Sequence, residues 1–292
     1  MPRSTARLTT RVMLCAVTLL LPACLVRTRV VAPPGKVANR PLLTARKEDL
    51  IDRIHQISDR IQSFTMKADM AASVGSLYNG AVKDYATIAG ILIFLRPDLI
   101  RIIGQDPVVH STLFDMASVG NEFHLSIPSK SRFIEGANDA PAKSPNKLEN
   151  LRPAAFLSAL LIQPPDAKTN VTLMEDDTDE TKAIYILFII RRNGDQLQLL
   201  RNFYFDRYTL QIVGQKIFDP SGEILSESKY AGWKPFGNIS FPTVVDIKRP
   251  QDNYEVTLTI SDVKFNTGDV TPEKFVLVQP PGYQLQQIKE LP

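Results

Sequence analysis

The sequence predicts a mainly β protein in which one curved antiparallel sheet packs against two helices. Three observations support this fold class. Extended apolar or alternating segments recur from Met66 to Val278, short turns separate most of them, and only two segments have helical spacing. Short turns join antiparallel neighbours, and a sheet with this many strands must curl or close. Two helices are then available to cover its open face.

Residues 1–23 predict a secretory signal that is removed. Three arginines and no acid precede the apolar run 12–23, which is roughly half the length of about twenty residues that a membrane-spanning helix needs. The run ends in Leu21-Pro22-Ala23-Cys24, which resembles the lipobox of bacterial lipoproteins. This resemblance implies cleavage before Cys24 and acylation of its thiol and new amine. The alternative is an ordinary secretory signal with an incidental cysteine.

A linker is predicted at residues 24–46, because prolines and basic side chains interrupt any regular pattern there. The lipobox resemblance implies that this linker is lipid-anchored through Cys24. Those basic side chains either gain about 1 kcal/mol each near an anionic membrane surface or belong to a solvated tether. Without residues 1–23 the chain carries equal numbers of basic and acidic side chains, which argues against a nucleic-acid partner. It also has no cysteine pair for a disulfide or a zinc site.

The first half of the remaining chain reads as one helix followed by short strands. Apolar residues at three- and four-residue steps from Leu50 to Phe64 form one stripe of a helix. After Phe64 the period changes to two, which predicts a strand with one buried face. Further strands are predicted at 82–95, 99–103, 111–117, 123–127 and 132–134.

The second half begins with a break in this pattern. Residues 136–146 predict a mobile loop, and residues 148–161 predict a short helical insert with Pro153 in its first turn. The strands then resume at 171–174, 183–191, 197–205, 209–218, 224–233, 241–248, 254–263 and 275–278.

No pattern of catalytic or metal-binding residues is evident. The three histidines lack ligand spacing, and neither GxSxG nor a phosphate-binding glycine loop occurs. The acidic run 175–180 lacks the glycine and the distal glutamate of an EF-hand, so a solvated hairpin tip explains it better. The sequence therefore predicts a binding protein without metal or cofactor, while a hydrolase with an unrecognised site stays an alternative.

Three short motifs resemble the LolA/LolB-like lipoprotein carriers. "GILIFLRPDLI" at 90–100 is similar to the G-x-L-x-x-x-RPN-L stretch of that family, Ser63-Phe64 opens the first strand, and "KFVLVQPPG" at 274–282 matches its final strand before PP-x-G. The resemblance implies a single LolA/LolB-like domain over residues 47–292. Its expected fold is an incomplete, half-open antiparallel β-barrel of about eleven strands, with the N-terminal helix and the mid-chain insert over an apolar cavity.

The family also implies a function. The expected protein is lipid-anchored in the cell envelope, facing the periplasm from the outer membrane, and holds acyl chains of lipoproteins or lipids for transfer or insertion. Its implied partners are those acyl chains, the membrane and a periplasmic carrier protein. Arg96 corresponds to the arginine that gates the lid. The loop that in the membrane-bound receptor carries an exposed leucine is polar here at 104–107. An envelope stress sensor or interaction protein on the same fold is the alternative.

The candidate cavity residues are apolar side chains on the expected inner face of the sheet and on the helical insert. They are Met66, Met70, Ile88, Leu92, Phe94, Ile100, Ile102, Phe123, Leu125, Phe156 and Leu160.

Overall fold

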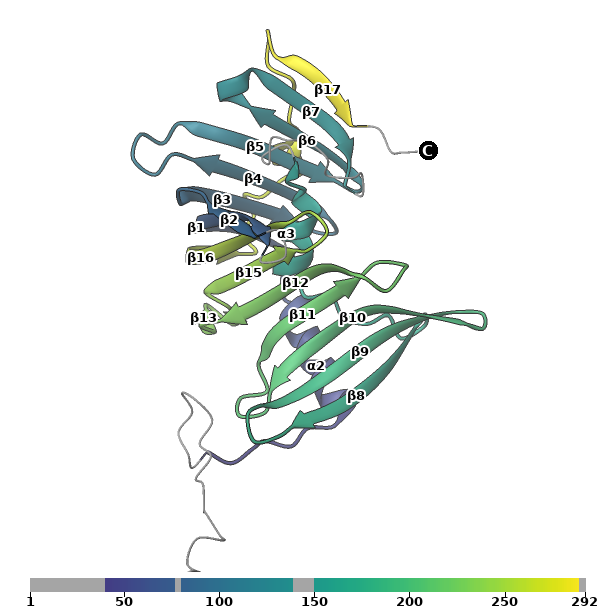
Figure 1. The fold of residues 1–292 in the computed structure, drawn as a ribbon. Coiled ribbons are helices and arrows are strands. Elements are labelled where there is room, and N and C mark those ends of the chain that lie inside the picture. The colour runs from purple at the N-terminus through teal and green to yellow at the C-terminus, as the bar shows by residue number, and fades with distance from the viewer. Residues whose placement is uncertain (1–39, 77–79, 139–149, 289–292) are drawn as a thin grey trace, which may run out of the picture. The chain divides into compact units, whose positions relative to one another are not determined.

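The computed structural model describes residues 40–76, 80–138 and 150–288 (Figure 1). The predicted signal, Cys24 and most of the linker lie outside these residues. Of the described residues, 41–76, 80–138, 150–179 and 183–288 belong to one compact unit, and residues 40 and 180–182 belong to another. The fold below is that of the first unit. None of the described helices has the length and apolarity needed to span a bilayer.

The first half of the compact unit is a run of antiparallel strands, because the two-residue period of its apolar residues places every second side chain in the core. On β3, for example, Gly90, Leu92 and Phe94 are buried, while Ile91 and Ile93 on the opposite face are half-buried. The strands are β1 (Ser63–Ser76), β2 (Ala81–Asp84), β3 (Ile88–Leu95), β4 (Leu99–Gln105), β5 (Thr112–Val119), β6 (Glu122–Ile127) and β7 (Arg132–Ala137).

The second half continues the same antiparallel sheet with longer strands. These are β8 (Asn170–Thr178), β9 (Ala183–Asn193), β10 (Gln196–Asp206), β11 (Ile212–Phe218), β12 (Ile224–Ala231), β15 (Val244–Arg249) and β16 (Tyr254–Phe265). A separate two-stranded sheet consists of β13 (Lys234–Phe236) and β14 (Ile239–Phe241).

The two halves meet where β1 pairs with β16, which gives one sheet of 15 strands. Its order is β17-β7-β6-β5-β4-β3-β1-β16-β15-β12-β11-β10-β9-β8, with β2 also paired to β1 (Figure 1). The final strand, β17 (Gln284–Ile288), adds to β7 in parallel. Since β17 and β8 do not meet, the sheet stays open. The predicted mainly β, half-open antiparallel architecture is thus confirmed.

Two α-helices pack against the inner face, which is the face that carries the core. In α2 (Lys47–Ser58), the Asp49 carboxylate accepts the Arg46 backbone N–H at 2.8 Å, and Leu50 and Ile54 are completely buried. Pro153 opens α3 (Pro153–Leu160), where its missing N–H costs no helical hydrogen bond. This second helix contacts β15, β4 and β5.

The structure differs from the expected elements in the number of strands and in one segment. The described residues form 17 strands rather than about eleven, since the run at 82–95 is divided into β2 and β3 and since β13, β14 and β17 are additional. The apolar segment 275–278 is not a strand. Its Phe275 is buried at the end of the 3₁₀ helix η4 (Pro272–Phe275) against β4 and β5, whereas Val276 and Val278 are exposed.

Candidate functional site

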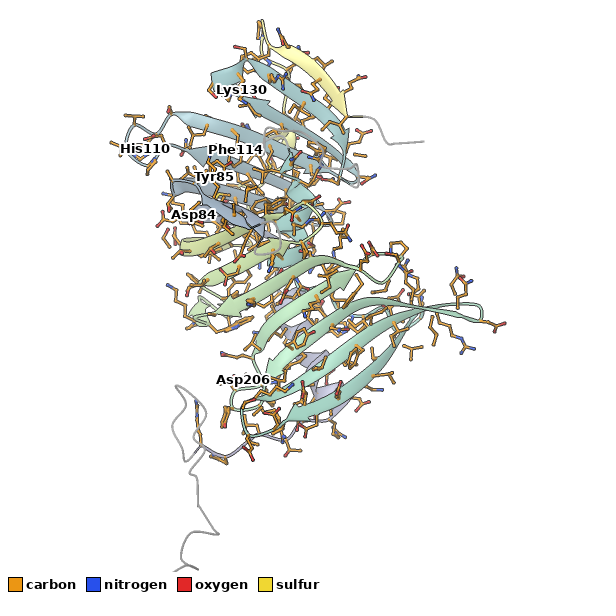
Figure 2. The ribbon with its side chains drawn as sticks, viewed as in Figure 1. Asp84, Tyr85, His110, Phe114, Lys130 and Asp206 are labelled. Atoms are coloured by element: carbon orange, nitrogen blue, oxygen red, sulfur yellow. The ribbon has the colours of Figure 1, made fainter. Side chains whose placement is uncertain are left out.

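An apolar cavity of about 340 Å³ lies between the inner face of the sheet and the start of α3. Its volume is in the range of small-molecule pockets, about 300–1,000 Å³. The wall comes mainly from β1, β3, β5 and β16, and Tyr85 and Phe114 lie on it from neighbouring parts of the sheet (Figure 2). The lining residues are Met70, Ala72, Ser73, Val74, Tyr85, Ala86, Ile88, Leu113, Phe114, Ser129, Leu151, Phe156, Tyr254 and Val256.

A pair of glycines on neighbouring strands gives two of these side chains their room. Gly90 on β3 and Gly104 on β4 lie directly opposite each other. A Cβ added at Gly90 would lie 2.8 Å from Met70 Cγ, and one added at Gly104 would overlap the Phe114 ring. Both glycines therefore allow a bulky wall residue to lie flat against the backbone, which is a recurrent use of glycine within strands.

The cavity also holds one buried polar group on β16. Within the described residues the Tyr254 hydroxyl is buried and has no hydrogen-bond partner. Burial raises the pKa of this phenol to about 12, because the charged form is poorly solvated there. The nearby Arg152 guanidinium lies 4.7 Å from the centre of the Phe123 ring and donates from Nη1 to Leu151 O at 3.0 Å. Burial lowers the pKa of Arg152.

The structure brings three of the predicted cavity residues to this cavity: Met70, Ile88 and Phe156. The other eight are buried in the packed core beside it, where they contact protein rather than open space. They are Met66, Leu92, Phe94, Ile100, Ile102, Phe123, Leu125 and Leu160. Sequence reasoning missed Phe114 and Tyr254, although Gly104 in a β-rich segment is a signal that a neighbouring side chain approaches the backbone.

Arg96 follows β3 and holds the end of α2. Its Nε donates to Ile61 O at 2.7 Å, and its Nη2 donates to Ser58 O and, at 3.1 Å, to Ser58 Oγ. Asn266 fixes the same turn from the other side, because its side-chain amide donates to Arg60 O at 2.7 Å. The Arg96 guanidinium thus holds the C-terminal end of α2 to the sheet. A positive charge is favourable at this end, because the helix dipole is negative there.

The hairpin between β4 and β5 exposes two apolar side chains at its tip. The Asp106 carboxylate accepts the backbone N–H groups of Val108 and Val109, at 2.8 Å and 2.9 Å. This turn leaves 81% of Val108 and 71% of Val109 exposed, beside His110 at the left of Figure 2. The loop predicted from the sequence, 104–107, ends just before this valine pair, so the exposed tip was not predicted.

Two of the three histidines lie near a carboxylate at separate surface positions. His55 Nδ1 lies 3.1 Å from the Asp59 carboxylate on α2, and His124 Nε2 lies 3.9 Å from the Glu135 carboxylate across β6 and β7. In residues 40–76, 80–138 and 150–288, no group of three or more His, Cys, Asp or Glu side chains is placed to hold a metal ion.

Comparison with solved structures identifies the fold. A LolA superfamily protein from Nitrosomonas europaea aligns with a TM-score of 0.50 at 11% identity, over 80% of this chain and 99% of that one. The chain has a LolA/LolB-like fold. A DUF1329 family protein from Desulfovibrio piger, with a TM-score of 0.52 at 13% identity, covers 79% of this chain and 98% of its own.

An outer membrane lipoprotein-sorting protein domain from Vibrio parahaemolyticus also shares the LolA/LolB-like fold. It aligns with a TM-score of 0.50 at 14% identity, over 79% of this chain and 97% of that one. No family model matches the sequence, and no curated protein matches it. At these identities the likeness establishes the fold, while the function must be argued from the site.

Proposed function

We propose that this protein is a lipid-anchored envelope protein that binds the acyl chains of lipoproteins or lipids in the apolar cavity, for transfer to or insertion in the outer membrane. The single observation that carries the proposal is the cavity of about 340 Å³ between β1, β3, β5, β16 and α3, whose wall is predominantly apolar. An acyl chain in water costs about 0.8 kcal/mol for each exposed CH₂ group, so a dry cavity stabilises it during passage through water.

Two further features support this function. The lipoprotein-sorting domain from Vibrio parahaemolyticus has the same fold, which supports an acyl ligand as the occupant of the cavity. The exposed pair Val108 and Val109 projects from a hairpin tip and suits contact with a membrane surface. Attachment through Cys24, gating by Arg96 and the outer-membrane location remain part of this proposal.

The proposal is tested on the chain from residue 24 with Cys24→Ser, which carries no acyl group and retains the whole compact unit. We expect native mass spectrometry to detect fatty acids or phospholipids bound after purification. Ala72→Trp places a large side chain in the cavity and should abolish this occupancy. Ala71→Trp is the matched control, because Ala71 is exposed and points away from the cavity.

An empty wild-type protein that also fails to take up added fatty acid would refute the carrier function. If the empty protein instead binds an envelope protein partner, the interaction or stress-sensing alternative is correct. Equal occupancy of the Ala72→Trp and Ala71→Trp variants would show that the ligand binds elsewhere.

A further inference from the structure

A group of polar side chains interrupts the apolar inner face of the second half of the sheet. It consists of Arg201 on β10, Gln215 on β11, and Ser226, Ser228 and Tyr230 on β12, and is called the inner polar cluster below. The strand register places these residues together. Gln215 lies directly opposite Ser228, and Ile217 lies opposite Arg201 on one side and Ser226 on the other.

Most of this cluster is buried without the partners that buried polar groups normally have. Four buried atoms of the cluster make no hydrogen bond to any described residue: Arg201 Nη1, Gln215 Oε1, Ser226 Oγ and Ser228 Oγ. Arg201 is half-buried, makes no ion pair with any described residue, and has its guanidinium carbon 5.6 Å from the centre of the Phe203 ring. A buried charge without a counter-ion is among the costliest features of a protein interior.

The polar groups of the cluster that are satisfied bind each other and oxygen atoms of α3. Gln215 Nε2 donates to Ser158 O at 2.6 Å and to the Tyr230 hydroxyl at 2.7 Å, and the Tyr230 hydroxyl donates to Ala159 O at 2.7 Å. The cluster therefore already binds oxygen acceptors, and the last turn of α3 supplies two of them. The remaining donors are the Arg201 guanidinium and the hydroxyls of Ser226 and Ser228.

These donors define the ligand chemistry. A guanidinium presents several N–H groups in a plane that matches the oxygens of a carboxylate or a phosphate, and neighbouring hydroxyls add further donors. We propose that the inner polar cluster binds the anionic oxygen group, a carboxylate or a phosphate, of the amphiphile whose acyl chain the cavity holds. This inference rests on the proposed function and specifies the headgroup of its ligand.

Helix α3 connects the two parts of the proposed site. Phe156 lines the cavity, and Ala159 contacts the cluster three residues later, which is about 4.5 Å along a helix axis. The anionic group replaces the two α3 carbonyls as acceptor for Gln215 and Tyr230, so binding moves the last turn of α3 away from β11 and β12. Ligand binding and displacement of this helix are therefore coupled.

The only tryptophan provides a direct readout of binding. Trp233 packs against Tyr230 with 6.3 Å between ring centres, so its fluorescence reports changes in the cluster. The chain from residue 24 with Cys24→Ser is titrated with dodecanoate, dodecyl phosphate, dodecanol and dodecyltrimethylammonium below their micelle concentrations. We expect one or both anions to bind at least about tenfold more tightly than the alcohol and the cation, since only the anions accept charge-assisted hydrogen bonds from the guanidinium.

Variants distinguish a role of Arg201 in ligand binding from a purely structural role. Arg201→Met should remove the preference for anions while dodecanol still binds, and Arg201→Lys should restore part of the preference. The melting temperature of the empty Arg201→Met protein should stay equal or rise, because the variant removes an unpaired buried charge. Arg192→Met, at an exposed arginine near the end of β9, is the control and should change neither property. The Ser226→Ala/Ser228→Ala double variant should weaken the anion preference by itself.

The outcomes distinguish this inference from the function on which it rests. If all four amphiphiles bind the wild type equally, or if Arg201→Met and the serine variant both keep the preference, the headgroup site is refuted and the acyl carrier stands. If none of the four binds, both proposals fail. If Arg201→Met lowers the melting temperature of the empty protein and the serine variant keeps the anion preference, Arg201 is structural and the site is refuted. Tighter binding of dodecanoate would indicate a fatty acid as the ligand, and tighter binding of dodecyl phosphate would indicate a phosphate-bearing lipid.

Discussion

Arg96 and Ser58 are joined through both oxygens of the serine, because the Nη2 group of the arginine donates to the backbone carbonyl and to the side-chain hydroxyl. A residue at the end of β3 thereby caps the last turn of α2. This contact gives the proposed lid function of Arg96 a physical basis, since any movement of the helix end must first break it.

Arg96→Leu should free the end of α2 without changing the fold. The substitution removes the three hydrogen bonds to Ser58 and Ile61. Each hydrogen bond from a charged donor contributes about 1.5–3 kcal/mol to stability. We expect faster amide hydrogen exchange over residues 55–62 and faster release of bound lipid. Unchanged exchange and release would refute a gating role, and Arg53→Leu, at a half-buried position of α2, is the control.

Gly104→Ala should reshape the cavity. The added methyl group overlaps the ring of Phe114, so the ring must move away from β4, and overpacking of this kind costs about 1–3 kcal/mol. Urea unfolding and lipid occupancy measure the two effects. Gly268→Ala provides the comparison, because an added Cβ there meets no atom within 4 Å. A Gly104→Ala protein with wild-type stability and occupancy would contradict the account of the cavity wall.

Tyr254 should make the protein sensitive to alkali. Its pKa is raised by burial to about 12, whereas the unfolded chain has a tyrosine pKa near 10. Below pH 10 the phenol is neutral in both states, so its stabilising effect is fully present. Between about pH 10 and 12 the unfolded state loses the proton first, and stability falls by on the order of 2–3 kcal/mol.

Tyr254→Phe should therefore flatten the fall in the free energy of unfolding over this pH range. Urea unfolding at a series of pH values from 9 to 12 measures the slope, and Tyr283→Phe at a half-buried position serves as the control. Burial raises the pKa of Tyr230 as well, so some alkaline loss will persist in the variant. Identical slopes for Tyr254→Phe and wild type would show that the phenol does not stay neutral in the fold.

Val108→Ser with Val109→Ser should weaken binding to membranes. Each valine contributes up to about 1.5–3 kcal/mol when it is fully removed from water, and both are exposed on one hairpin tip. Flotation with vesicles of phosphatidylethanolamine and phosphatidylglycerol measures the effect on the unacylated chain. Val119→Ser is the matched control, since Val119 is also exposed but ends β5 at the opposite end of the strand. Equal flotation of the tip variant and wild type would rule out membrane contact by this hairpin.

Most of the sheet is predictable from residue alternation alone. On β9, Tyr185, Leu187 and Ile189 are buried while Ile184 and Ile186 are half-buried, so the strand itself was clear but its inner face was not. The strand predicted at 275–278 was wrong for a different reason. Phe275 and Val276 have strand composition, but Phe275 packs against β4 while the Arg101 guanidinium binds Lys274 O at 2.8 Å. Tertiary contacts there override local preference.

The candidate site was harder to predict than the fold. Parity on a strand tells which side chains share a face, but it does not tell which space on the inner face the chain itself fills. Leu92 and Phe94 face inward and are packed solid, whereas Ile88 on the same strand borders the cavity. The inner polar cluster gave no local signal, since Arg201 and Ser226 come together only through the pairing of three strands.

The pairing of β1 with β16 has a consequence for how the chain matures. Phe64 lies opposite Phe265, so the middle of the sheet joins positions about two hundred residues apart in the sequence. Contacts of such long range form slowly. β1 cannot pair with β16 until nearly all of the chain has been synthesised. A chain cut short before β16 would leave one edge of β1 unpaired and prone to aggregation, so most of the chain must be synthesised before the middle of the sheet can form.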